Sequence, residues 1–342
     1  MVAAGATPVS SRELIARLLG AGLRRRKAQT LAPKKPGRSL IRAKRLRKGD
    51  VVAVTSPAGP VPTDRLDAGL RVLESWGLAV NVMANVRGQH EHFSYLSSSD
   101  AQRAADFMQA WCDPVVTAVF CARGGYGAQR MVDLLDWDAL AVAGPKVLVG
   151  FSDVTTLHQA FATRLGISTI HGPVVTSLGG GDDQSRAHLR SLLFEPVQGL
   201  SLAPESLPSL VGGRADGVLV GGNVALLAAE IGTPDAQPAT DSIAVLEDVG
   251  EELYRLDRLL TQLLRAGWFD RVRGIALGQF TDCGQPDSFR HLIEDRLVPL
   301  GVPMIVNLPV GHVEGNLAFP FGVPATLDAD AGTLELREAP LL

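Results

Sequence analysis

Residues 115–135 read VVTAVFCARGGYGAQRMVDLL, and residues 146–164 read KVLVGFSDVTTLHQAFATR. Each stretch begins with a short apolar run, passes through a turn rich in Gly or Ser, and ends with apolar residues at helical spacing. The run 115–122 is apolar except for Thr117, which is typical of a central parallel strand covered by helices on both faces. The two stretches therefore predict strand–turn–helix units of one parallel sheet.

The same alternation extends toward the N-terminus. Apolar runs predict strands over 51–55 and 79–83, and helical spacing predicts helices over 63–76 and 100–111, the latter capped by Ser98 or Ser99. With helices over 127–135 and 153–164, strand and helix alternate four times within about 115 residues, which favours right-handed crossovers in an α/β fold.

A second domain is expected beyond residue 216, because residues 194–216 are rich in Pro, Ser, Gly and Leu. Its elements are shorter and less regular, so we expect a smaller α+β domain that is partly barrel-like. The predicted division is an extension over 1–48, a first domain over 49–195, a linker over 196–215 and a second domain over 216–342. Strands are expected over 217–220, 243–246, 275–279, 304–307 and 333–336, and helices over 223–231 and 253–264.

Charge separates the extension from the rest of the chain. Residues 1–48 contain fourteen Lys or Arg and one acid, Glu13, although the 342 residues together carry a net charge of −3. The extension could be a disordered basic tail, the product of a start codon placed too early, or a segment that targets an organelle or an anionic surface. The acidic remainder argues against nucleic acid as the main partner.

Composition excludes several classes of protein. At 46% apolar and 20% charged residues, the chain is ordinary for a globular protein, and it has no apolar run long enough for a transmembrane helix. Its three cysteines form no CxxC pair, which argues against a disulfide framework or a structural zinc site and favours a reducing compartment.

The turn at Gly150-Phe151-Ser152-Asp153 could present a nucleophile. A sharp turn after a buried strand lifts a Ser hydroxyl above the sheet edge and aims the Asp153 N–H at a developing oxyanion. The full G-x-S-x-G pattern is absent because Val154 holds its last position. The alternative is that Ser152 or Asp153 only caps a helix.

Two further glycine turns follow predicted strands. In Arg123-Gly124-Gly125-Tyr126-Gly127, the N–H groups of Gly124 and Gly125 could bind an anion, or the glycines could only form a tight turn. The spacing fits no nucleotide-binding loop. In the second domain, Gly221-Gly222-Asn223 repeats this arrangement of strand, glycine turn and helix, and Asn223 is a natural cap for the helix.

A carboxylate and a histidine close later strands. Glu247 ends an apolar strand, and His312 follows another in PVGHVEG; either could be structural. Taken with Ser152, they occur in the order Ser, acid, His, which suits a hydrolase with a serine nucleophile, a histidine base and an orienting carboxylate. Such chemistry needs no metal or organic cofactor, so none is predicted.

The segments CARGGYGAQR, VGFSDVTTLH, VGGNVALLAAEIGTP, VLEDVGEELYRLDRLL and PVGHVEGNLAFPFG resemble those of bacterial murein LD-carboxypeptidases, serine peptidases that recycle cell-wall peptides. The resemblance covers residues 50–340. It implies Ser152 as nucleophile, Glu247 and His312 as its partners, and a cleft between a Rossmann-like sandwich and a C-terminal domain with barrel character. It also implies a cytoplasmic homodimer.

The implied reaction removes the terminal D-alanine from a murein tetrapeptide that is free, UDP-linked or sugar-linked. The N–H groups of Asp153, Gly124 and Gly125 would form the oxyanion hole. Arg123 is the candidate for binding the D-alanine carboxylate, because a guanidinium binds a carboxylate with two hydrogen bonds. Tyr126 and Asn223 are further candidates for substrate contact.

Two alternatives stay open. The related microcin-immunity proteins cleave acyl–nucleotide antibiotics, although the Arg before the paired glycines favours murein peptides. A module that binds muropeptides without hydrolysing them is the second alternative.

Overall fold

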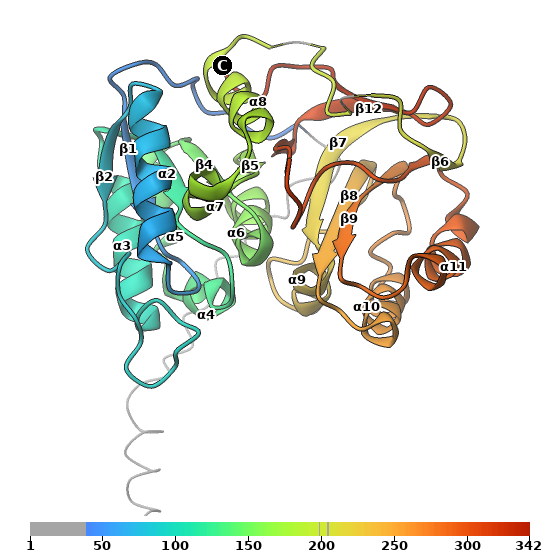
Figure 1. The fold of residues 1–342 in the computed structure, drawn as a ribbon, viewed down its shortest axis with the longest axis horizontal. Helices are drawn as coiled ribbons and strands as arrows, with labels where there is room; N and C mark the ends of the chain where they lie inside the picture. Colours follow the sequence, from blue (N-terminus) through green and yellow to red (C-terminus); the bar gives the residue numbers. More distant parts are fainter. Residues whose placement is uncertain (1–38, 198, 204) are drawn as a thin grey trace, which may run out of the picture. The chain divides into compact units, whose positions relative to one another are not determined.

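The first sheet contains both of the stretches quoted above. In a computed structural model, which describes residues 39–197, 199–203 and 205–342, this sheet has six strands in the order β11–β5–β4–β3–β1–β2 (Figure 1). The five that come first in the chain are parallel. They are β1 (Val51–Thr55), β2 (Ala79–Val82), β3 (Val116–Cys121), β4 (Val147–Gly150) and β5 (Thr169–His171).

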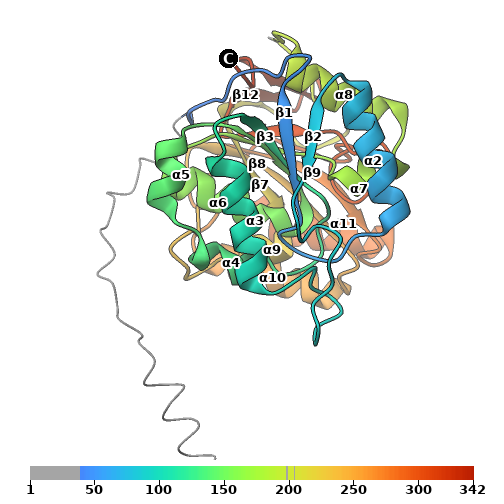
Figure 2. The same cartoon turned by 90° about the vertical axis from the view of Figure 1, so that its left-hand side faces the viewer.

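Helices cover both faces of this sheet (Figure 2). One face carries α2 (Thr63–Ser75), α7 (Val175–Gly180) and α8 (Asp183–Phe194). The other carries α3 (Asp100–Cys112), α4 (Ala128–Met131), α5 (Trp137–Ala143) and α6 (Thr155–Ala160). α2 and α7 pack closely, because a Cβ atom on Gly69 would come 1.9 Å from the Val175 carbonyl oxygen. A Cβ atom on Gly179 would likewise come 2.1 Å from the Arg65 carbonyl oxygen, so the first turn of α2 lies next to the end of α7.

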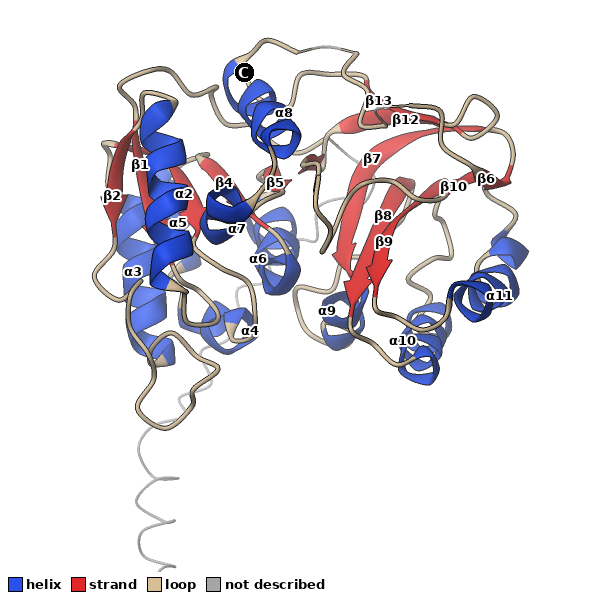
Figure 3. Ribbon diagram, viewed as in Figure 1, coloured by secondary structure: helices blue, strands red, loops and turns tan. Residues whose placement is uncertain are grey.

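The second sheet has seven strands in the order β13–β12–β7–β8–β9–β10–β6 and curls on itself (Figure 3). Four strands are parallel: β7 (Arg214–Asn223), β8 (Ser242–Val249), β9 (Gly274–Thr281) and β10 (Met304–Ile305). β6 (Ser209–Val211), β12 (Pro324–Asp328) and β13 (Thr333–Leu336) pair antiparallel at its edges. Its helices are α9 (Val224–Ala229), α10 (Leu253–Arg265) and α11 (Pro286–Arg296).

One strand connects the two halves of the folded chain. β11 (Phe319–Phe321) comes from the C-terminal half but pairs antiparallel with β5 at the edge of the first sheet. An ion pair of 2.5 Å between Arg164 and Asp235 also joins the halves, and the Asp235 carboxylate is buried. The two halves are thus held together by backbone pairing as well as by side chains.

Residues 39–48 belong to the folded body, although the sequence places them in the extension. Ala43 and Leu46 are buried. The backbone N–H of Leu46 donates to the Leu193 carbonyl at 2.9 Å, and that of Arg45 to the Leu342 carbonyl at 2.9 Å. The rest of the predicted extension, residues 1–38, lies outside the described residues.

The predicted α/β fold, with a parallel first sheet and a second domain of barrel character, is confirmed. Several details differ. The helix predicted over 127–135 is α4 followed by a 3₁₀ turn, and the one over 153–164 is a 3₁₀ turn, α6 and a π-helical turn. The predicted linker contains β6. In the part of the chain that the structure describes, no helix is both long and apolar enough to span a membrane.

Candidate active site

Ser152 occupies the turn between β4 and α6. Its φ angle is 64°, in the left-handed region that residues other than Gly rarely adopt. That conformation costs about 1–2 kcal/mol. A 3₁₀ turn over Ser152–Val154 leads from this position into α6. Strained turns of this kind lift a nucleophile above the edge of a parallel sheet, so the backbone favours the nucleophile interpretation over simple helix capping.

Glu247 and His312 meet Ser152 from the C-terminal half. The Ser152 Oγ lies 3.0 Å from Nε2 of His312, and Nδ1 of His312 lies 2.8 Å from Oε2 of Glu247. An ionised carboxylate only accepts hydrogen bonds, so Nδ1 carries the proton and Nε2 is left to accept from the Ser152 hydroxyl. The structure thus brings the three predicted residues into one hydrogen-bonded chain.

The approach of His312 to Glu247 depends on Gly311. Glu247 lies in β8 where the pairing with β9 shifts register, and it is fully buried. A Cβ atom on Gly311, whose φ is 117°, would come 2.7 Å from Oε2 of Glu247. The loop can pass this close to the carboxylate only because residue 311 has no side chain.

The glycine turn after β3 lies against the serine turn. A Cβ atom on Gly124 would come 2.9 Å from the Cβ of Ser152. The buried Asp153 carboxylate accepts a hydrogen bond of 2.8 Å from the Ala128 N–H, at the far end of the glycine turn, and burial raises its pKa to about 6. Asp153 therefore ties the two turns together. Gly124 lies against Ser152, whereas a Cβ atom on Gly125 would come 3.3 Å from the backbone of Gly59, in the loop after β1.

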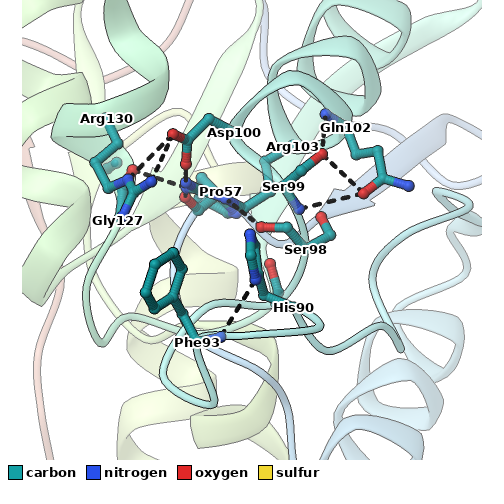
Figure 4. Close-up of polar contacts among 12 residues, drawn as sticks. Pro57, His90, Phe93, Ser98, Ser99, Asp100, Gln102, Arg103, Gly127 and Arg130 are labelled. Carbon is teal, nitrogen blue, oxygen red and sulfur yellow. Dashed lines mark hydrogen bonds and ion pairs between the residues drawn. The ribbon is translucent and has the colours of Figure 1, made fainter. Parts of the chain in front are cut away.

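A buried guanidinium holds the same turn from the other side (Figure 4). The Arg103 side chain is 1% exposed. Its Nη1 donates to the carbonyls of Gly127, at 2.7 Å, and Pro57, and its Nε donates to the Ser98 carbonyl at 3.2 Å. Its Nη2 pairs with Asp100. One side chain thus links the segments that follow β1 and β3.

The sequence analysis did not single out Arg103, but a signal was present. In α3 the buried residues include Phe107, Ala110 and Trp111, and Arg103 lies one helical turn before Phe107 on that face. A lone cation on an apolar helix face predicts a buried partner, because an unpaired buried charge is costly.

The predicted substrate contacts lie in different surroundings. Arg123 is exposed, and its Nη1 donates to the Pro60 carbonyl at 2.6 Å. Tyr126 is 46% exposed. Asn223 is buried; its amide donates to Asp248 at 2.9 Å and accepts from the N–H of Leu226 as the cap of α9. The structure therefore gives the Asn223 side chain its capping role.

Two further histidines are buried near His312. Burial lowers the pKa of His158 to about 4 and that of His171 well below its ordinary value. The Phe151 ring lies 6.0 Å from the His171 ring and 4.9 Å from the His312 ring, measured between centroids. Both buried imidazoles are therefore neutral at pH 7, and they add no positive charge behind His312.

A pocket of about 470 Å³ opens beside His312. His312 and Phe151 form part of its wall, together with Arg65 of α2 and Asn316. Asp182 and Glu314 also line it, whereas Arg123 does not. The sequence analysis identified none of these pocket residues except His312. Asn316 could have been noticed, since it lies four residues after His312 in the same motif.

Comparison with known proteins identifies the family of this chain. Residues 52–172 match the N-terminal domain, and residues 216–327 the C-terminal domain, of LD-carboxypeptidases. The chain belongs to the LD-carboxypeptidase family. All three residues of the hydrogen-bonded chain lie within the two matched regions.

Several relatives in this family cover most of the chain. A Streptomyces coelicolor protein that is provisionally assigned as a carboxypeptidase is 54% identical over 301 residues, covering 87% of this chain and 97% of the relative. The murein tetrapeptide carboxypeptidase of Pseudomonas aeruginosa is 37% identical over 290 residues, covering 82% and 93%. The microcin C7 self-immunity protein of Escherichia coli is 23% identical over 329 residues, covering 86% and 94%.

A solved structure supports the same fold. The muramoyltetrapeptide carboxypeptidase of Oxalobacter formigenes matches with a TM-score of 0.73 and 29% identity, covering 84% of this chain and 97% of that one. The two-domain arrangement implied by the sequence motifs is therefore the arrangement of this family.

Proposed function

We propose that the protein is a serine LD-carboxypeptidase that removes the terminal D-alanine from murein tetrapeptides. The observation that carries the proposal is the chain of hydrogen bonds from Ser152 through His312 to Glu247, at 3.0 and 2.8 Å. Membership in the LD-carboxypeptidase family and the similarity to a murein tetrapeptide carboxypeptidase support the choice of substrate.

In the acylation step, the Ser152 Oγ attacks the carbonyl that joins the L-centre of the third residue to D-alanine. The hydroxyl proton passes to Nε2 of His312 while the new C–O bond forms. The buried Glu247 carboxylate stabilises the imidazolium and fixes its tautomer. N–H groups of Asp153 and of Gly124 or Gly125 stabilise the oxyanion.

When the tetrahedral intermediate collapses, the C–N bond breaks and His312 returns the proton to the departing nitrogen. D-Alanine leaves, and the tripeptide stays esterified to Ser152. Nε2 of His312 then takes a proton from water, which attacks the ester carbonyl. The C–O bond to Ser152 breaks, Oγ regains a proton from His312, and the tripeptide leaves. Every proton in this sequence is carried by the protein and water, so the proposed mechanism is independent of metal.

Substrate contacts are proposed at Arg123 and Tyr126. The guanidinium of Arg123 is exposed and follows the strand that leads to the glycine turn, and Tyr126 lies within that turn. Asn223 would act through the positions of Asp248 and α9 and would not touch substrate. A cytoplasmic homodimer remains a prediction from the family resemblance.

The test uses purified protein and L-Ala-γ-D-Glu-meso-diaminopimelate-D-Ala, with D-alanine release followed by mass spectrometry. We expect release that persists in EDTA and is abolished by Ser152→Ala. Release that EDTA abolishes would overturn the metal-independent mechanism. Binding of the peptide without release would instead favour the non-hydrolytic muropeptide module.

A parallel reaction distinguishes the remaining alternative. An aminoacyl sulfamoyl nucleoside with an acidic aminoacyl group is a probe for the acyl–nucleotide hydrolases, because it presents a nucleoside leaving group. Cleavage of this probe, together with no release from the tetrapeptide, would replace the proposed function by the microcin-immunity type.

A further inference from the structure

Asn316 lies in the wall of the pocket beside His312 and has a buried hydrogen-bond donor with no partner among the described residues. The residue is 6% exposed, and its Nδ2 finds no acceptor among the described residues. Leaving a buried donor unpaired costs about 1–3 kcal/mol. Such a group in a pocket wall therefore indicates an acceptor that arrives with a ligand.

The orientation of this amide is fixed by the backbone. The N–H of Gly311 donates to the Asn316 side-chain oxygen at 2.9 Å. A backbone N–H can only donate, so the other amide atom must be the nitrogen. The same bond ties Asn316 to the residue next to His312, which places the free donor on the loop that carries the imidazole.

The chemistry of the proposed reaction assigns this pocket to the leaving residue. His312 returns its proton to the departing nitrogen, so that nitrogen must come within hydrogen-bond reach of Nε2. The carboxylate of a terminal amino acid is two bonds from its nitrogen. The pocket has His312 in its wall, so it is a candidate place for the free carboxylate of the leaving residue.

Among the charged residues in the pocket wall, Arg65 is available for a carboxylate. It forms no ion pair or hydrogen bond through its side chain with any residue in the described ranges. Arg186 is already engaged, since its Nε donates to the Leu178 carbonyl at 2.9 Å and its Nη1 pairs with Asp183 at 3.1 Å. Arg65 thus supplies a free cation.

The two acidic residues of the pocket, Asp182 and Glu314, do not prevent a substrate carboxylate from binding there. Asp182 accepts hydrogen bonds from Ser185 and from the N–H of Gly315 at 2.7 Å, and these hydrogen bonds lower its pKa, so its negative charge is already balanced by donors. Glu314 is exposed, and water screens its charge.

We propose that the pocket beside His312 binds the leaving residue of the substrate, with Asn316 Nδ2 and Arg65 binding its free carboxylate. This rests on the proposed function, because it takes the substrate to be a peptide with a free carboxyl end. In this proposal the substrate carboxylate contacts Asn316 and Arg65 instead of Arg123. Selectivity for a free carboxyl end then comes from hydrogen-bond donors close to His312.

Equilibrium binding tests the inference without turnover. In a Ser152→Ala background, titration calorimetry would compare the tetrapeptide ending in D-alanine with the same peptide ending in D-alaninamide. We expect the acid to bind about tenfold or more tightly than the amide, as for a charge-assisted hydrogen bond of about 1.5–3 kcal/mol. Asn316→Asp keeps the oxygen that accepts from Gly311 but puts a repelling oxygen in place of the donor, so it should abolish or reverse this preference.

Two arginine variants complete the experiment. Arg65→Gln should reduce the preference for the acid several-fold, whereas Arg71→Gln, which removes the same charge from the same helix outside the pocket, should leave it unchanged. Equal weakening of acid and amide by Asn316→Asp would overturn the inference, since it would mean a purely structural role for Asn316. Loss of the preference in Arg123→Ala, with Asn316→Asp retaining it, would return the carboxylate to Arg123.

The same peptides separate this inference from the proposed function. If the protein with Ser152 intact releases no D-alanine while the acid preference follows Asn316, the proposed hydrolysis fails and the binding site stands. If D-alanine is released but acid and amide bind equally in every variant, the hydrolysis stands and the binding site fails.

Discussion

The backbone of Gly124 lies directly against the side chain of Ser152. A Cβ atom on residue 124 would be 2.9 Å from the Cβ and 3.1 Å from the Oγ of Ser152. Two turns from different strands, separated by 28 positions in the chain, are therefore in van der Waals contact at the proposed nucleophile. The contact tolerates no side chain on the glycine, so it makes a sharp prediction.

Gly124→Ala should separate the two turns while the fold persists. Moving the N–H groups of the glycine turn by a few tenths of an ångström weakens stabilisation of the oxyanion, and loss of one such donor lowers kcat by about 100- to 1,000-fold. We expect a fall of this order in kcat, with a smaller change in KM. Steady-state D-alanine release measures both constants, and a variant with wild-type kcat would contradict the proposed oxyanion hole.

Glu247→Gln should lower kcat on the order of 10,000-fold, because a neutral amide no longer stabilises the imidazolium and can bind the wrong tautomer of His312. Asp248→Asn is the matched control. That neighbouring carboxylate binds Asn223 and the N–H groups of Ala225 and Val249, and none of its hydrogen bonds reaches His312.

The control variant should therefore lose stability and keep its rate. Comparable losses of kcat in both carboxylate variants would argue that β8 is merely distorted and that Glu247 has no direct role. Thermal unfolding of the two proteins, measured beside their kinetics, separates these cases.

Arg103→Met should destabilise the protein by about 3–5 kcal/mol, the range for breaking a buried charge network. The change leaves the carbonyls of Pro57 and Gly127 and the carboxylate of Asp100 without their shared donor. Because Gly127 ends the glycine turn, kcat should also fall in protein that is still folded. Urea unfolding and kinetics at low temperature would measure the two effects.

Arg130→Gln is the comparison for this network. Arg130 pairs with the other oxygen of Asp100 at 3.0 Å, and its side chain is about one-third exposed. Because this pair is more exposed, its loss should destabilise the protein far less than the loss of Arg103. If the two arginine variants were equally destabilised, burial of the Arg103 guanidinium would not be the cause.

The stability of the protein should depend on His158 in acid. Its folded-state pKa of about 4 is depressed below the ordinary 6.5, so the unfolded chain binds the proton first as pH falls. The contribution is fully present above pH 6.5 and is lost toward pH 4, on the order of 3 kcal/mol. His158→Gln should flatten this part of the profile.

Buried carboxyl groups change the free energy of unfolding in the opposite direction over part of this pH range. The difference in unfolding free energy between wild type and His158→Gln is therefore the quantity to measure. Burial raises the pKa of Asp153 and of Asp248 to about 6, and their contribution to stability falls as pH rises through that value. Urea unfolding at several pH values between 4 and 7.5 gives the two curves. Parallel curves for wild type and His158→Gln would contradict the assignment.

Local patterns were enough to predict β1–β4, β7–β10 and β13, but β5, β6, β11 and β12 were not predicted. Ser152, Glu247 and His312 each follow an apolar run, and parallel strands bring such positions to one edge. β11 was missed because its sequence is Phe-Pro-Phe and its partner, β5, lies about 150 positions earlier; only tertiary pairing makes it a strand.

The missed site residues depend on the same kind of distant contact. Asn316 becomes a free donor only after Gly311 has engaged its oxygen, and Arg65 reaches the pocket because α2 packs on α7. The sequence analysis also missed α11, but here a local signal was present, because Pro286 lies at the first position of the helix, where proline is favoured. The roles of Asn316 and Arg65 depend on contacts between distant parts of the chain, so local sequence patterns cannot predict them.

The pairing of β11 with β5 also sets the order in which this molecule can mature. A ribosome produces Ser152 and its parallel sheet long before residues 312–321, so the nascent chain has a hydroxyl with no imidazole beside it and an unpaired β5 edge. An open edge invites pairing with other chains. The late segment that carries His312 also covers that edge, so pairing of the edge and completion of the hydrogen-bonded chain at Ser152 both require residues 312–321.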